Sequence, residues 1–109
     1  MKIWVDDVRP APSKFGYKIV HSVNEAKKLI EEIEKCNELV YDGNYETLEL
    51  IDLDYDSGDY EKDGGPYIKL MDWLVERGTL YPLAFHSQNC VGMEYMKRMY
   101  RRYWLGESL

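Results

Sequence analysis

The chain has 109 residues, of which 45% are hydrophobic and 31% charged, and its 20 acidic against 14 basic side chains give a net charge of -6. This length predicts one domain, residues 1–109, with a single hydrophobic core. The acidic balance argues against binding to duplex nucleic acid or to an anionic membrane, because both need a surplus of lysine and arginine. It leaves a nucleotide-sized ligand open.

Targeting and cysteine signals are absent from the sequence. The first apolar run is too short for a signal peptide, and no run reaches the roughly 18 apolar residues that a membrane-spanning helix needs. A cytoplasmic location is therefore expected. Cys36 and Cys90 are neither closely spaced nor set among histidines, so we expect reduced thiols rather than a disulfide or a zinc site.

Two short strands are predicted near the N-terminus. The apolar run at residues 3–5 stops at Asp6 and Asp7. Two prolines follow and forbid an immediate helix, so a loop is expected there. Residues 17–21 predict the second strand.

A helix should follow the second strand. Ser22 stands three residues before Glu25, which is typical of a capping box, and the apolar residues after it recur at helical spacing up to Ile33. The signals then change to turn chemistry. Residues 38–46 are compatible with a hairpin or with an elaborated loop, and the sequence leaves both open.

The second half of the chain alternates strand and helix in the same way. Residues 48–54 predict a third strand, and residues 81–85 a fourth. Between them, Pro66 fits the first turn of a helix that stops at Gly78. A last helix should begin near Val91. The sequence thus predicts an α/β fold, with a largely parallel sheet of about four strands and helices on both faces.

Polar residues gather where the predicted strands end. In such sheets the ligand site lies outside the carboxyl ends of the strands. Four aspartates fall there, and Mg²⁺ (or Mn²⁺) is the cation that such carboxylates suit, because uncompensated charges about 4 Å apart repel by about 4 kcal/mol at an effective dielectric of about 20. Solvated strand-end acids are the alternative. The predicted metal ligands are Asp6, Asp7, Asp54 and Asp56.

Further candidates follow the first and fourth strands. His86 could act as general acid or base, with Asp54 and Asp7 as the other predicted catalytic residues, although a histidine at a strand end is often only structural. A serine-hydrolase triad is not expected, because no Gly-x-Ser-x-Gly elbow is present. The predicted phosphate-binding residues are Ser87, Arg9 and Asn89, with helix capping as the alternative for Ser87 and Asn89.

The last predicted helix carries two further patterns. Its methionines and tyrosines recur at three- and four-residue steps, which favours a core face over a cofactor site; they are Met93, Met96, Met99, Tyr100 and Tyr103. Its cations are expected on a solvated face, with a nucleic-acid backbone or a partner's acids as the alternative; they are Lys97, Arg98, Arg101 and Arg102.

An acid pair after the first strand, an aspartate after the third and a hydroxyl after the fourth resemble a response-regulator receiver domain. The resemblance places its acid pair at Asp6 and Asp7, its phosphoryl acceptor at Asp54 and its hydroxyl at Ser87. It implies a flavodoxin-like three-layer sandwich. The fifth strand with its Lys-Pro signature is missing, so the usual phosphate-contacting lysine has no counterpart, which puts ordinary phosphorelay signalling in doubt.

The chain more closely resembles the cyclic-phosphate-processing receiver family, over nearly its whole length. The shared segments are residues 4–12, the helix start at Ser22, residues 53–56, residues 63–74 and residues 86–92. Tyr55 stands where the family often has histidine, and Cys90 where it often has proline, so no role of that histidine carries over. The resemblance implies opening of cyclic phosphates on nucleotides or RNA ends.

Three hypotheses follow. The first is a metal-dependent phosphoesterase that acts on a small phosphorylated ligand, a cyclic nucleotide or an RNA terminus. His86 would protonate the leaving oxygen or activate water, and Ser87 with Arg9 would bind the phosphate. The second is a non-enzymatic receiver-like signalling or interaction module that is phosphorylated on Asp54 or binds a partner through its aromatic-rich surface. The third is a degenerate domain without chemistry.

Overall fold

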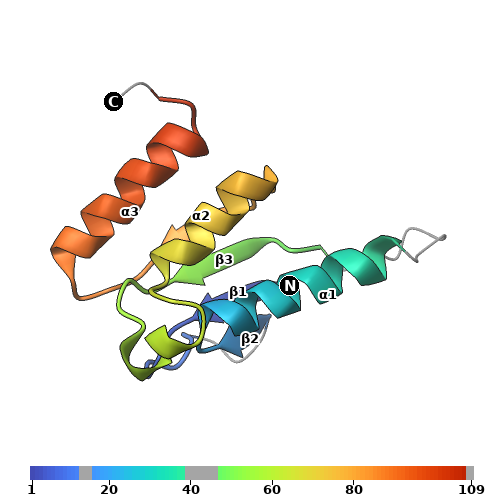
Figure 1. Cartoon of the computed structure of the whole chain (residues 1–109), viewed down its shortest axis with the longest axis horizontal. Helices are drawn as coiled ribbons and strands as arrows, with labels where there is room; N and C mark the ends of the chain where they lie inside the picture. The colour runs from blue at the N-terminus through green and yellow to red at the C-terminus, as the bar shows by residue number, and fades with distance from the viewer. Residues whose placement is uncertain (13–15, 39–46, 108–109) are drawn as a thin grey trace.

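A four-stranded sheet lies at the centre of the computed structural model, which describes residues 1–12, 16–38 and 47–107. The strand order is β2-β1-β3-β4, and each neighbouring pair is parallel (Figure 1). The predicted α/β class and parallel sheet are confirmed. Three strands, β2, β3 and β4, are shorter than expected. The strands are Lys2–Val5 (β1), Tyr17–Val20 (β2), Leu50–Leu53 (β3) and Leu83–Phe85 (β4).

Three α-helices and one 3-10 helix connect or follow these strands. They are α1 (Val23–Glu38), η1 (Gly58–Lys62), α2 (Ile68–Arg77) and α3 (Cys90–Tyr103). The helices expected from the sequence are therefore present. The hairpin-or-loop question falls mainly on residues 39–46, which lie outside the described residues. None of the described helices combines the length and the apolar character that crossing a lipid bilayer requires.

The start of α1 is capped as its sequence predicts, and it is also tied to a distant loop. The Ser22 hydroxyl accepts a hydrogen bond from the backbone N–H of Glu25 at 3.1 Å. The same hydroxyl donates to Oδ2 of Asp63 at 2.6 Å, and the Asn24 side chain donates to Oδ1 of Asp63 at 3.0 Å. Because Asp63 follows η1, these bonds hold the loop that carries η1 against the start of α1.

The hydrophobic core lies on one face of the sheet. Ile3 and Leu53, which point to this face, share a buried cluster with Ile30 of α1, Leu74 of α2 and Met96 of α3. All three helices therefore cover the same face, and in the described part of the chain the fold has two layers. The predicted flavodoxin-like α/β fold is confirmed, but the described helices cover one face of the sheet, where helices on both faces were expected.

The connection between β1 and β2 explains the missing layer. In the strand order β2-β1-β3-β4, the chain moves towards the β4 edge when it passes from β2 to β3 and from β3 to β4. It moves the opposite way, towards the β2 edge, when it passes from β1 to β2. Right-handed crossovers place α1 and α2 on one face and the β1–β2 connection on the opposite face. That connection spans only residues 6–16 and contains Pro10 and Pro12, so it has no room for an ordinary helix.

Aromatic side chains occupy part of the face that lacks helices. Trp4 points to that face, yet only 3% of it is exposed. Its ring stacks on His86 with centroids 3.7 Å apart and meets the Tyr17 ring edge-on at 5.8 Å. Its indole N–H donates to the carbonyl of Arg9 at 2.8 Å. Trp4 thereby fixes both the β1–β2 connection and the ring of His86.

Candidate metal and phosphate site at the sheet edge

Three strand ends meet at one point of the sheet edge. Asp6 follows β1, Asp54 follows β3 and His86 follows β4. A carboxylate oxygen from each aspartate and a ring nitrogen of His86 all lie within 4.8 Å of one another. Asp6 is 1% exposed and Asp54 7%. The acids after the first and third strands converge because β1 and β3 are neighbours.

Backbone N–H groups hold the carboxylate of Asp6. Its Oδ1 accepts from the N–H of Val8 at 2.9 Å and from the N–H of Arg9 at 2.6 Å, and its Oδ2 lies 2.8 Å from Nε2 of His86. Burial raises the pKa of Asp6, but these hydrogen bonds and the charge of His86 outweigh it, so the pKa is lowered overall. Asp6 is therefore ionised near neutral pH.

His86 lies between two carboxylates. Its Nε2 contacts Asp6, and its Nδ1 lies 2.7 Å from Oδ1 of Asp52. Burial lowers the pKa of His86, but the hydrogen bonds and charges of Asp52 and Asp6 raise it by more, so the net shift is upward. Proton transfer by His86 thus requires one of these two bonds to open. Its expected catalytic role stays a prediction.

Asp52 was not among the site residues that the sequence predicts. It lies within β3, where it points to the same face as Trp4, its register partner in β1. Carboxylates in this position commonly orient a metal-binding imidazole through its other ring nitrogen. A signal was present in the sequence, since Asp52 is the one charged residue in an otherwise apolar strand.

Asp7 and Asp56 occupy different surroundings. Burial and the charges of Asp6 and Asp54 raise the pKa of Asp7, so this carboxyl group lies close to the cluster. Its Oδ2 is 2.4 Å from where a Cβ on Gly58 would lie, and the φ of 54° there also favours glycine. Asp56 is exposed and, among the described residues, is not part of the group that could hold a metal ion.

The three predicted phosphate-binding residues all have structural contacts. The Ser87 hydroxyl accepts from the N–H of Asn89 at 3.1 Å, and Oδ1 of Asn89 accepts from the N–H of Gly92 at 2.9 Å, which caps α3. Arg9 is exposed, and its backbone rather than its side chain contacts Asp6. The capping alternative is therefore observed, and phosphate binding by these residues stays a prediction.

A second histidine borders the cluster. His21 directly follows β2, its Nδ1 lies 3.0 Å from the carbonyl oxygen of Asp6, and the centroid of its ring lies 5.1 Å from that of the stacked Tyr60 ring. The Tyr67 hydroxyl donates to its carbonyl at 2.6 Å. Ligand sites of parallel sheets lie outside the carboxyl ends of the strands, and His21 directly follows such an end, so the sequence could have indicated it too.

Comparison with known proteins agrees with this architecture. The family model described as the cyclic-phosphate processing receiver domain matches residues 1–102. No match was found among curated proteins or among solved structures. The matched range contains every strand and the site residues at the sheet edge, and its description connects the chain with cyclic-phosphate processing. The chain therefore belongs to the family of cyclic-phosphate processing receiver domains.

Proposed function

We propose that this protein is a metal-dependent phosphoesterase that opens cyclic phosphates of nucleotides or RNA ends. The observation that carries the proposal is the cluster of Asp6, Asp54 and His86, whose ligand atoms lie within 4.8 Å of one another. Two carboxylates and an imidazole at this spacing suit a divalent cation. The pKa of Asp7 is raised by burial and, to a smaller extent, by the charges of Asp6 and Asp54, which a cation at this edge would neutralise.

The donor set also bears on the identity of the cation. Carboxylates suit Mg²⁺ and Mn²⁺, and an imidazole ligand favours Mn²⁺ over Mg²⁺. In this proposal Asp6, Asp54 and His86 hold the ion, with Asp7 beside them, and Asp52 orients His86. A bound cation would withdraw charge from the phosphoryl oxygens.

Opening a cyclic phosphate adds one water molecule. The water oxygen bonds to phosphorus, one ester P–O bond breaks, and a proton ends on the released ribose oxygen. Two side chains at this edge that are not ligands of the ion in this proposal, Asp7 and His21, could transfer that proton. The Ser87 hydroxyl, the Arg9 guanidinium and Asn89 are the phosphate-binding groups of the proposal, since they follow the same strand ends.

A hydrolysis assay tests this proposal. The purified protein would be incubated with 2′,3′-cyclic nucleotides and either Mg²⁺ or Mn²⁺, and the monophosphate products separated by chromatography. We expect turnover that depends on the cation and is lost in Asp54→Asn, in which an isosteric amide removes the charge. Turnover no higher than that of the Asp54→Asn protein would refute the proposal.

One observation favours a non-enzymatic receiver-like role as the second candidate. Oδ1 of Asp54 accepts from the N–H of Tyr55 at 2.7 Å, whereas no hydrogen bond to its other oxygen is recorded among the described residues. That oxygen could accept a phosphoryl group. Treatment with acetyl phosphate followed by intact mass measurement distinguishes the two roles. An Asp54-dependent gain of one phosphoryl group, without hydrolysis of cyclic nucleotides, would favour signalling.

A further inference from the structure

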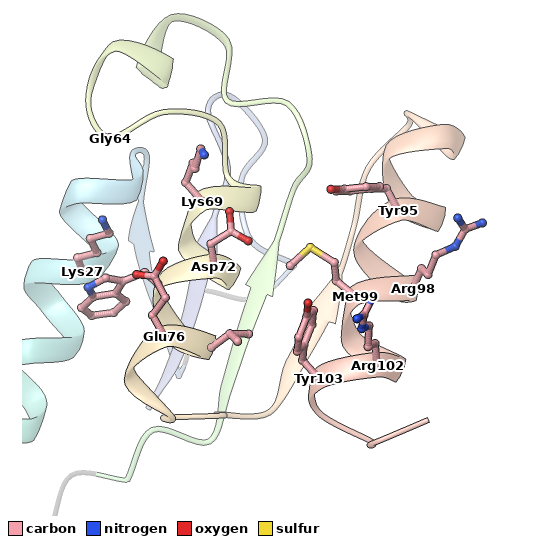
Figure 2. Close-up of a pocket in the computed structure, with 12 residues that line it drawn as sticks. Lys27, Gly64, Lys69, Asp72, Glu76, Tyr95, Arg98, Met99, Arg102 and Tyr103 are labelled. Carbon is pink, nitrogen blue, oxygen red and sulfur yellow. The ribbon is translucent and has the colours of Figure 1, made fainter. Parts of the chain in front are cut away.

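A groove with a volume of about 650 Å³ lies on the outer side of the helices, mainly between α2 and α3 (Figure 2). This volume is within the range of about 300–1,000 Å³ that small-ligand sites occupy. None of the residues of the acidic cluster lines it. Its polar lining includes Lys27, Lys69, Asp72, Glu76, Arg98 and Arg102, and aromatic rings lie beside these groups.

The groove is basic although the protein is acidic. Four cationic side chains line it against two carboxylates, Asp72 and Glu76, in a chain of net charge -6. Helix α3 carries four cations and a single acid, Glu94. In the described part of the chain, none of the four α3 cations forms an ion pair with a carboxylate. This positive charge is therefore available to an anionic partner.

Exposed aromatic rings accompany these cations. Tyr95 is 53% exposed and Tyr103 43%. Figure 2 shows both tyrosines and Met99 projecting from α3 on the side that faces α2. The lining residues 95, 98, 99, 102 and 103 recur at helical spacing, so they form one stripe of α3.

This stripe corrects one expectation from the sequence. Met96 is fully buried, and Tyr100 packs against the core, as predicted. Tyr103 was expected on the same core face, but it is 43% exposed and lines the groove. Met99 packs against the core, as predicted, and also lines the groove. Arg98 and Arg102, expected on a solvated face, line it with them. The helix therefore has a second organised face besides its core face.

We propose that this α2–α3 groove binds single-stranded RNA. Phosphates would contact the cations of α3, and unpaired bases would stack on Tyr95 and Tyr103, because rings stack on every base without needing its sequence. The carboxylates Asp72 and Glu76 on the α2 side can accept hydrogen bonds from base amino groups or ribose hydroxyls. A duplex offers no unpaired base to the tyrosines.

The choice of RNA over DNA rests on the proposed function, since 2′,3′-cyclic phosphates form only on ribose. The position of the groove agrees with this choice. It includes Lys69, in the first turn of α2, and Gly64, in the loop that precedes α2. Because α2 follows β3, its start lies towards the carboxyl edge that carries Asp54. An RNA strand in the groove would thus have one end directed towards the acidic cluster.

Fluorescence anisotropy with a short labelled single-stranded RNA tests the proposal. The double variant Arg98→Glu/Arg102→Glu should weaken binding by about ten-fold or more and reduce its dependence on salt concentration. The matched control is Lys28→Glu/Lys35→Glu on α1, which makes the same change in net charge at exposed positions outside the groove. We expect the control to weaken binding by less than about three-fold.

Tyr95→Leu isolates stacking from charge, because it removes an exposed ring and leaves the net charge unchanged. Loss of one base–ring stack should weaken binding by about five-fold or more. Thermal melting would verify that each variant is folded. Equal losses in the groove variant and the α1 control would overturn the proposal, as would tighter binding of duplex RNA, of DNA of the same sequence or of polyglutamate.

The experiment separates this proposal from the proposed function. Binding is measured with the Asp54→Asn protein as well, which should retain its affinity for RNA. RNA binding that requires the groove, without any hydrolysis by the unchanged protein, would refute only the phosphoesterase. Hydrolysis of cyclic mononucleotides without RNA binding would refute only the groove.

Discussion

The acidic edge and the α2–α3 groove organise charge in opposite ways. At the edge, Asp6 and Asp54 are almost completely buried, and Asp6 is held by short bonds from backbone N–H groups and from His86. In the groove, long cationic side chains and half-exposed tyrosines line an open surface. We therefore expect one substitution at the edge to remove most of its affinity for a cation. In the groove, each substitution should reduce the affinity for RNA by a limited factor.

The largest effect is expected at the metal ligands. Asp54→Asn should lower the affinity for Mn²⁺ by more than about 100-fold, because substitutions of outer-shell partners alone cost about 10–100-fold. Thermal-shift titration with Mn²⁺ measures this. Asp56→Asn is the matched control, since Asp56 is exposed and lies outside the cluster. Similar losses in the two variants would show that the edge binds cations diffusely, as the groove binds anions.

Asp52→Asn should have the next largest effect. It keeps the size of the side chain but removes the charge that faces Nδ1 of His86 at 2.7 Å. If Asp52 orients the imidazole, affinity for Mn²⁺ should fall by about 10–100-fold. At low Mn²⁺ the variant should hydrolyse much more slowly than the unchanged protein, whereas at saturating Mn²⁺ the difference between their rates should be smaller. Unchanged Mn²⁺ affinity would mean that Asp52 only supports the fold.

Gly92 marks the junction between the edge and α3. A Cβ at this position would lie 2.3 Å from the ring of Tyr55. Alanine is favoured over glycine in a helix by about 1 kcal/mol, but overpacking costs about 1–3 kcal/mol. Gly92→Ala should therefore lower the free energy of unfolding by about 1 kcal/mol in urea denaturation. Val91→Ala, at a position that is 83% exposed, is the control and should stay within about 0.5 kcal/mol.

The smallest effect is expected from pH in the metal-free protein. The raised pKa of His86 stabilises the fold fully below its ordinary value of 6.5, and this contribution is lost as pH rises through the folded-state pKa. The lowered pKa of Asp6 stabilises above 3.8 and is lost as pH falls through the folded-state pKa. Urea midpoints in EDTA should thus be highest between these values.

Asp52→Asn sharpens this pH comparison. It removes one of the two carboxylates that raise the pKa of His86, so the loss of stability on the neutral side should begin at a lower pH. The fall on the acid side should change little, because the backbone bonds to Asp6 remain. Superimposable pH profiles of the two proteins would contradict the assigned Asp52–His86 bond.

Local signals in the sequence predicted much of the fold and part of the site. The capping box at Ser22 marked the start of α1, and acids after two apolar runs marked the ends of β1 and β3. Spacing of this kind reflects interactions between close neighbours in the chain, so it can be seen without tertiary structure. The sequence also predicted that Asp6 and Asp54 lie close together, because the carboxyl ends of parallel strands lie at the same edge of a sheet.

The remaining features depend on contacts between distant residues. Asp52 and His86 are 34 positions apart, and which face each occupies was decided by strand register. Among the described residues no helix covers the face that holds Trp4, which follows from crossover handedness combined with a short β1–β2 connection.

The sequence by itself determined an acidic α/β chain with carboxylates at its strand ends. Only the tertiary structure decided how that charge is distributed. It buries two carboxylates beside His86, and it sets Arg98 and Arg102 at a groove, because packing of Met96 and Tyr100 on the core turns Tyr95 and Met99 towards α2. The net charge of -6 is the sum over an acidic edge and a basic groove. The sum alone could not reveal these two regions, because it does not depend on where the charged residues lie.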